Sequence, residues 1–235
     1  MNPFQTLNRG LLIACLGISL AAFGGEQAAE ASLRNRVRGT VSVMGKPVAG
    51  ASVTLWTTRG GQTPEQVKAV RSKKDGSFAL SVKPKNGTVH YLIASGGTVN
   101  NSNVDRLTML TVLDGTERGT AVINERTTVG SVWPNAQQLE GDQLIGSTNA
   151  LAIGSGHVKH LVDQRTGQFG ETLLNGFNLL SSETAARINV LSDLLALCGD
   201  PSKERGCTQL FQLTGATNSL DAMTNIAKLP WKNSG

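Results

Sequence analysis

The 235-residue sequence contains few aromatic side chains, and this shortage limits what the protein can be. Phe, Trp and Tyr together make up 4% of the chain, so a folded core has to be built from Val, Leu and Ala. No aromatic residues are interleaved with the basic ones and no nucleic-acid reading motif is present, so we expect no nucleic-acid partner. Outside the N-terminal segment, no apolar run reaches the roughly 20 residues of a membrane-spanning helix.

The sequence also lacks the motifs that organise catalysis or cofactor binding. It has no Gly-x-Ser-x-Gly turn for a nucleophilic serine and no phosphate-binding loop, because Gly45-Lys46 is followed by Pro47. His157 and His160 would share one helix face close to Asp163, which is a spacing that suits a metal. No glutamate stands between these histidines to act as a general base, and a solvated helix surface is the better interpretation. We therefore predict no catalytic, cofactor-binding or metal-binding residues, no cofactor and no enzyme activity.

Three cysteines are present, and their positions favour one disulfide. Cys15 lies in an N-terminal targeting segment, which leaves Cys198 and Cys207 as an even pair. The polar loop between these two has Gly at both ends and Pro201 inside, so it can fold back on itself. Zinc would need further Cys or His ligands close by, and the sequence offers none. We predict a Cys198–Cys207 disulfide, as is typical of an exported chain.

The first 31 residues have the pattern of a signal peptide. A polar stretch with one positive charge, Arg9, precedes an apolar run over 11–23, and Ala29-Glu30-Ala31 offers small residues for a signal peptidase. We expect cleavage after Ala31, with cleavage after Gly24 as the second choice. Leu12-Ile13-Ala14-Cys15 also resembles a lipobox, in which case Cys15 would carry a lipid anchor. The expected location is periplasmic or extracellular, with membrane attachment only if Cys15 is lipidated.

The formal charge of +5 is mostly dispersed along the sequence. Arg36 and Arg38 are two residues apart and therefore share one face of the first expected strand. A solvated strand face is the first interpretation of this pair, and an anionic membrane or wall polymer is the second.

Three segments within residues 39–82 alternate apolar with small or polar side chains, which is the period of half-buried strands, and 90–94 is a short apolar strand. Gly45-Lys46-Pro47 and Asp75-Gly76 supply turns between them. Seven strands are predicted, over 37–43, 51–57, 67–72, 76–82, 90–94, 107–113 and 120–123. His90 opens its strand and is expected at the sheet edge. Seven short strands separated by turns fit a two-sheet sandwich.

The segment from Gly39 to Val82 resembles carboxypeptidase-regulatory-like modules, which are small transthyretin-like β-sandwiches found as accessory domains on exported proteins. The resemblance implies a module that holds or presents another molecule and does no chemistry itself. It also implies an antiparallel β-sandwich, which we place at residues 32–123.

From Asn124 onward the pattern becomes helical. Asn124 caps a helix whose apolar positions include Val129, Val132 and Trp133, and Pro134 is expected to end or kink it. The strongest expected helix covers 182–197, with Ser182 as its cap. Further helices are predicted over 149–162, 207–213 and 218–229.

The helical half resembles a bacterial module that stands upstream of streptogramin-lyase-like β-propellers in exported proteins. The matching segments are 124–129, 161–163 with Gly167, 188–198, 207–211, and 222–227 with Pro230. The sequence contains no propeller residues, so lyase activity is not carried over.

The sequence as a whole predicts an α+β protein with three parts: a signal peptide over 1–31, a transthyretin-like antiparallel β-sandwich over 32–123 and a small helical domain with one disulfide over 124–235. The expected function is non-enzymatic binding or scaffolding in the bacterial cell envelope, with a protein or an envelope polymer as partner. One alternative is carbohydrate binding on the sandwich surface, for which Trp56, Phe78 and Tyr91 are the available aromatics. The other is that this chain is the separated front half of a lyase-like propeller protein.

Overall fold

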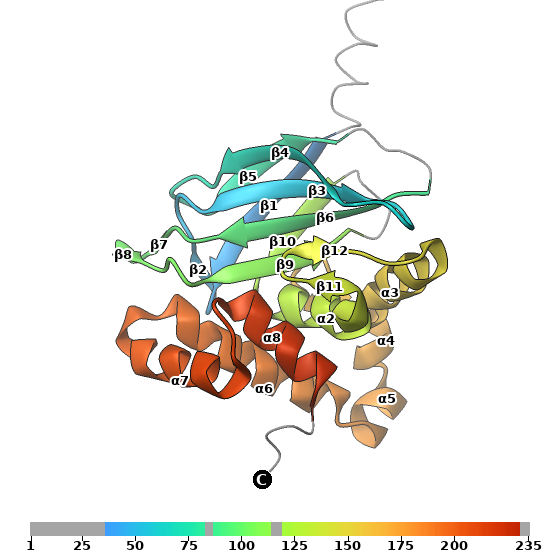
Figure 1. Ribbon diagram of the computed structural model, residues 1–235. Helices are drawn as coiled ribbons and strands as arrows, with labels where there is room; N and C mark the ends of the chain where they lie inside the picture. The colour runs from blue at the N-terminus through green and yellow to red at the C-terminus, as the bar shows by residue number, and fades with distance from the viewer. Residues whose placement is uncertain (1–35, 83–86, 114–118, 231–235) are drawn as a thin grey trace, which may run out of the picture. The chain divides into compact units, whose positions relative to one another are not determined.

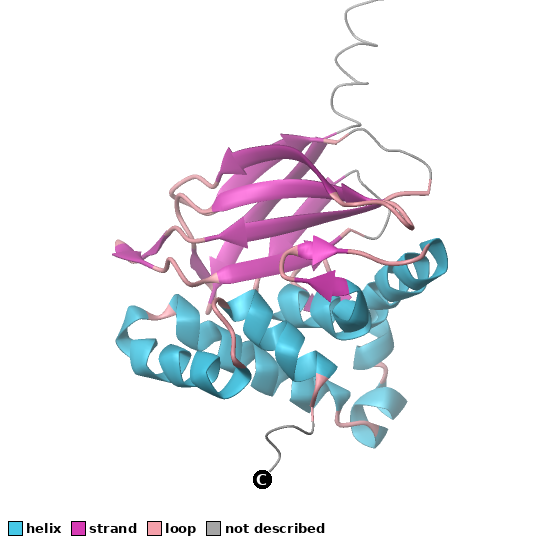
Figure 2. Ribbon diagram, viewed as in Figure 1, coloured by secondary structure: helices cyan, strands magenta, loops and turns pink. Residues whose placement is uncertain are grey.

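The computed structural model describes residues 36–82, 87–113 and 119–230, which form a mixed α+β structure (Figures 1 and 2). The main strands are β1 (Arg36–Val43), β3 (Ser52–Thr58), β4 (Glu65–Arg71), β5 (Ser77–Ser81), β6 (Val89–Ser95), β9 (Thr108–Val112) and β10 (Gly119–Ile123). Two-residue strands are β2 (Lys46–Pro47), β7 (Thr98–Val99), β8 (Ser102–Asn103), β11 (Leu139–Glu140), β12 (Gln143–Leu144), β13 (Val162–Asp163) and β14 (Gln168–Phe169). The helices are α2 (Glu125–Asn135), α3 (Thr148–Leu161), α4 (Glu171–Leu174), α5 (Gly176–Ser181), α6 (Thr184–Ala196), α7 (Glu204–Thr214) and α8 (Ser219–Lys228), and the 3-10 turns are η1 (Ala136–Gln138), η2 (Leu197–Gly199) and η3 (Pro201–Lys203).

The seven predicted strands are all present and form two four-stranded sheets together with β2. One sheet has the order β4-β3-β6-β9, and in the other β1 pairs with β10, β5 and β2. In Figure 2 the second sheet lies behind the first, and the inward side chains of both belong to one hydrophobic cluster. Burial alternates along β1, β3 and β5, which have one buried face. Consecutive residues are buried in β6 and β9, so these strands are covered on both faces.

Two details of the predicted sheets are wrong. The strands β1 and β10 pair in parallel, with Val37 opposite Gly119 and Val41 opposite Ile123, so the sheets are not wholly antiparallel. Gly39 permits this close pairing, because a Cβ at that position would lie 1.9 Å from the carbonyl oxygen of Ala121. His90 is buried in β6, an inner strand, and does not lie at a sheet edge.

The helices lie along the β9 edge of the front sheet, and their hydroxyl groups complete its hydrogen bonding (Figure 1). The backbone N–H of Leu110 donates to the Thr128 hydroxyl at 3.1 Å, and that of Val112 donates to the Ser131 hydroxyl at 3.0 Å. The N–H of Thr108 donates to Ser219 on α8 at 2.8 Å. An edge strand normally exposes such groups to solvent or to another strand. Here three helix hydroxyls take the place of the next strand.

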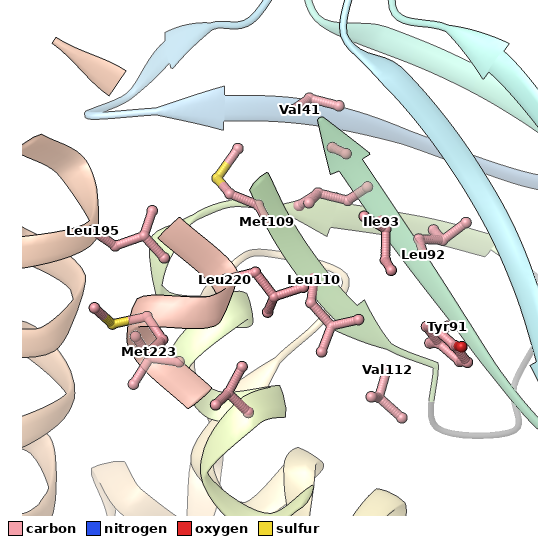
Figure 3. Packing of buried hydrophobic residues seen from close by; sticks show 14 of the residues in the cluster. Val41, Tyr91, Leu92, Ile93, Met109, Leu110, Val112, Leu195, Leu220 and Met223 are labelled. Atoms are coloured by element: carbon pink, nitrogen blue, oxygen red, sulfur yellow. The ribbon is translucent and has the colours of Figure 1, made fainter. Parts of the chain in front are cut away.

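A single hydrophobic cluster extends from the sheets into the helical layer (Figure 3). Leu110 of β9 lies beside Leu220 of α8, and on the other side of that helix Met223 lies near Leu195 of α6, while Met109 is also part of the cluster. All five side chains are buried. The sheets and helices therefore stabilise one another through shared apolar burial.

The helical predictions need three corrections. Trp133 was expected on the apolar face of α2, yet 39% of it is exposed, whereas Thr128 and Ser131 are fully buried. Pro134 does not stop α2 at Trp133, since the helix continues to Asn135 before a 3-10 turn begins. The N-cap of α6 is Glu183 and not Ser182. Asn124 does cap α2, with its side chain accepting from the N–H of Thr127.

The β1–β2 turn is tied to the start of α2. Met44 and Gly45 both have positive φ, at 52° and 71°, as a type I′ hairpin turn requires. The left-handed region is unfavourable for a methionine. The Met44 N–H donates a short hydrogen bond to the Glu125 carboxylate, which holds this turn in place. Burial raises the pKa of Glu125, and the nearby charge of Asp193 raises it further, while the hydrogen bond from Met44 lowers it.

The raised pKa of Glu125 predicts a pH-dependent stability. The folded state binds this proton more tightly than the unfolded state, whose value is near the ordinary 4.5. The contribution of protonated Glu125 to the free energy of unfolding is therefore fully present below the unfolded-state pKa. It is lost as pH rises through the folded-state pKa. We expect the difference in the free energy of unfolding, wild type minus Glu125→Gln, to fall as pH rises across that interval. Urea unfolding of both proteins at a series of pH values measures it, and a difference that stays flat or rises would contradict the prediction.

Candidate functional site

An apolar groove of about 560 Å³ lies between α6, α7 and α8. We define the apolar groove by its apolar lining residues, which are Leu191, Leu194, Leu197, Gly206, Leu210, Leu213, Ile226, Leu229 and Pro230. Gln209, Thr214, Asn225 and Lys228 complete its lining. A volume of this size falls in the range of ligand-binding pockets.

The Cys198–Cys207 disulfide fixes one end of the groove. The two sulfur atoms are 2.04 Å apart, and the bridge joins η2 to the first turns of α7. Leu197 and Gly206, the neighbours of the two cysteines, both line the groove. A Cβ on Gly206 would lie 3.2 Å from a methyl group of Leu197, so the glycine allows the two segments to approach closely. The predicted disulfide is confirmed, and it holds two walls of the groove together.

Hydrogen bonds fix the other walls. Helix α7 ends at Gly215, whose φ of 68° is the left-handed conformation typical of glycine after a helix. The Asn225 side chain of α8 donates to the carbonyl of Thr214 at 3.1 Å, which joins α8 to the end of α7. The Lys228 ammonium donates to the carbonyl of Leu139 at 2.6 Å. The end of α8 is thereby anchored to the β11 strand.

The groove offers hydrophobic contact and little charge. Leu213 is 68% exposed and Leu229 is 45% exposed. Burial of apolar surface is favourable by about 25 cal/mol for each Å² removed from water, so a partner that covers these two leucines would be stabilised by the contact. Among the described residues that line the groove, Lys228 alone carries a charge, and no aromatic side chain occurs. Such a surface is suited to binding an apolar partner.

A smaller hollow adjoins the apolar groove. It measures about 300 Å³ and its lining includes Trp133, Leu161 and Ile188, and it shares Leu191 with the groove. The exposed indole of Trp133 therefore extends the apolar surface from α2 onto α6. Glu183 and Arg187, which form an ion pair at 3.0 Å, also line this hollow.

The structure does not bring the other candidate residues to the groove. His157 and His160 are exposed on α3 with ring centroids 6.0 Å apart, and His160 Nδ1 lies 3.0 Å from the Thr172 hydroxyl. Within the described residues, no three His, Cys, Asp or Glu side chains are grouped as a metal site. Arg36 and Arg38 are exposed on β1.

Trp56 lies away from the groove, and the targeting residues are not among the described residues. Trp56 is half-buried in β3 and stacks on Tyr91, with ring centroids 6.2 Å apart. Trp231, Cys15 and the Ala31 cleavage position lie outside the described residues. No described helix is both long enough and apolar enough to cross a membrane.

Sequence reasoning missed the apolar groove. Ala185, Ile188, Leu191, Leu194 and Leu195 recur at helical spacing in the sequence of α6, but Leu191 and Leu194 are only partly buried. On α7, Leu210 and Phe211 are buried whereas Leu213 points to solvent. The sequence signal for the groove was an apolar residue, Leu213, that lies outside the buried stripe of the amphipathic helix α7.

Comparison with known proteins does not identify a family for this chain. No protein-family model matches the sequence, and no curated protein matches it significantly.

Proposed function

We propose that this chain is a non-enzymatic binding module that docks an amphipathic helix of a partner protein in the apolar groove. The main observation in support of this proposal is the groove of about 560 Å³, whose walls include the exposed Leu213 and Leu229. Exposed apolar surface of this kind typically marks a protein–protein interaction site. A groove between helices can accept a further helix that presents apolar side chains at three- and four-residue spacing.

The chemistry of the lining favours a protein over an envelope polymer. Polysaccharides are bound through stacked aromatics and many polar groups, and the described lining of the groove has no aromatic residue. The alternative of carbohydrate binding on the sheet has lost most of its support, because Phe78 and Tyr91 are buried. Trp56 alone would remain as a stacking surface. No observation favours the lyase-related alternative.

We interpret the two sheets as a transthyretin-like sandwich of the carboxypeptidase-regulatory-like kind, with the parallel β1–β10 pair as a variation. The helical half would be the scaffold for the partner. The Cys198–Cys207 disulfide is consistent with an oxidising compartment. We therefore place the protein in the cell envelope, either released after Ala31 or anchored through Cys15.

Replacement of Leu213 tests the groove directly. Leu213→Glu adds a charge that a docked apolar helix would bury without a partner, so affinity should fall by at least about tenfold. Ile153→Glu is the matched control, since Ile153 is 62% exposed on α3, outside the groove lining. Both proteins should fold, because both positions are exposed.

A photo-crosslinking amino acid at position 213 or 153 locates the partner in cells that make the protein. We expect a crosslinked partner from position 213 and none from position 153, and the isolated partner should bind Ile153→Glu as it binds wild type. Equal binding by Leu213→Glu would reject the groove as the site. Concentration-dependent dimerisation lost in Leu213→Glu, or vesicle binding lost in it, would replace the proposed occupant with a second copy or a membrane.

A further inference from the structure

A second hollow, with different chemistry, lies on another side of α6. We call it the polar cleft; it measures about 550 Å³. Its polar and charged lining residues are Thr40, Ser42, Asn124, Glu125, Arg126, Thr166, Gln168, Asn189, Ser192 and Asp193. Met44, Gly45, Val122 and Ala196 complete the wall. The sheet, the start of α2 and one face of α6 meet here.

The α6 side of the cleft is a polar stripe. Asn189, Ser192, Asp193 and Ala196 recur at three- and four-residue spacing, so they share one helix face. Ser192 is 6% exposed, and its hydroxyl oxygen has no hydrogen-bond partner in the described part of the chain. An unpaired buried hydroxyl costs free energy. Because Ser192 lines the cleft, a ligand bound there could complete its hydrogen bonding.

Two carboxylates, those of Glu125 and Asp193, line the same cleft as Ser192. Glu125 accepts from the Met44 N–H, and neither Glu125 nor Asp193 has a Lys, Arg or His partner within salt-bridge distance among the described residues. Arg126 also lines the cleft, and its charge lowers the pKa of Glu125. The Arg126 guanidinium donates to Gln168 at 2.6 Å and stacks over Phe169 at 5.1 Å. The cleft is therefore acidic within a chain whose formal charge is +5.

We propose that the polar cleft binds a primary ammonium group carried on a short aliphatic chain. An ammonium has three N–H donors and no acceptor. The Glu125 carboxylate, the Asp193 carboxylate and the Ser192 hydroxyl are hydrogen-bond acceptors among the residues that line the cleft. Met44, Val122 and Ala196 give the aliphatic stem an apolar wall. A calcium site usually gathers several carboxylates, and no group of three or more His, Cys, Asp or Glu side chains that could hold a metal ion occurs among the described residues.

The ammonium has two possible sources, a free amine or a lysine side chain of a partner. Both present the same group on a flexible four-carbon stem. n-Butylamine is therefore the first probe, and Nα-acetyl-lysine methylamide is the second. Tighter binding of the lysine derivative would indicate that the natural ligand is a lysine side chain of a partner. Tighter binding of butylamine would indicate that it is a free amine.

The test combines a binding titration with three variants. In a two-dimensional amide NMR titration, butylamine should shift the backbone amides of Met44, Asn189 and Asp193 and reach saturation. Asp193→Asn should weaken binding by about tenfold or more. Asp142→Asn, which removes an exposed carboxylate outside the cleft lining, should bind as wild type. Leu213→Glu should also bind as wild type, which separates this inference from the groove.

Ser192→Ala distinguishes a ligand-binding role from a structural one. Removal of an unpaired buried hydroxyl should raise the melting temperature, while loss of an acceptor should weaken amine binding severalfold. A group with a purely structural role would not change stability and affinity in opposite directions. Titration that never saturates, tetramethylammonium binding as well as butylamine, or unchanged affinity in Asp193→Asn would each overturn the proposal.

Discussion

Replacement of Thr128 by Val together with Ser131 by Ala should lower the free energy of unfolding by about 4 kcal/mol, because each buried N–H left unpaired costs roughly 1–3 kcal/mol. The two hydroxyls accept from Leu110 and Val112, and both hydroxyl-bearing residues are fully buried. No water can reach these amides after the substitution without opening the contact between α2 and β9. The loss is thus large although the helix itself tolerates both new residues.

Urea unfolding measures the stability, and hydrogen exchange locates the change. Faster exchange is expected first at the amides of Leu110 and Val112. Thr128→Ser keeps the hydroxyl and serves as one control. Ser155→Ala serves as the other, because Ser155 donates only to carbonyls within α3. A double variant that loses less than about 1 kcal/mol would show that hydroxyl acceptors are not what closes this sheet edge.

Replacement of both Cys198 and Cys207 by Ser should lower the free energy of unfolding by about 3 kcal/mol, the loop-entropy value for a ring of this size. The bridge spans nine positions of sequence, and both cysteines are buried. Loss of the bridge should also loosen Leu197 and Gly206, which line the apolar groove. Reduced protein is therefore expected to bind its partner more weakly as well as to unfold earlier.

Thermal unfolding can be followed by one spectroscopic signal from the sheets and another from the helices. The two melting curves show whether loss of the disulfide destabilises the helices alone or the sheets as well. The sequence alone suggests that a cysteine-free sheet region is indifferent to reductant. The structure changes that expectation, since Val43 of β1 packs directly on Gly199 of η2 and the hydrophobic cluster is shared. We expect both signals to move together. The double serine variant should not respond to reductant, and a sheet signal that stays in place after reduction would contradict the shared core.

The sequence by itself determined the local elements. Alternation over 39–82 and a short apolar run over 90–94, separated by glycine and proline turns, predicted strands, because a strand with one buried face has a period of two. Asn124 and Asn218 were recognisable as helix starts, because a short polar side chain can accept from the first free amides. The cysteine pair followed from count and spacing. Each of these features depends on interactions between residues close in the sequence.

Only the tertiary structure decided which polar residues are buried and which apolar ones are exposed. Thr128 and Ser131 look like solvent-facing helix residues until an edge strand with unpaired amides lies against them. Trp133 and Leu213 look like core residues until the neighbouring helices leave them uncovered. Likewise, Glu125 and Asp193 belong to different helices, and only the packing of α6 against α2 and β1 brings them to one cleft. The physical reason is that hydrogen-bond satisfaction and burial depend on which distant segment lies opposite, a choice that local periodicity does not encode.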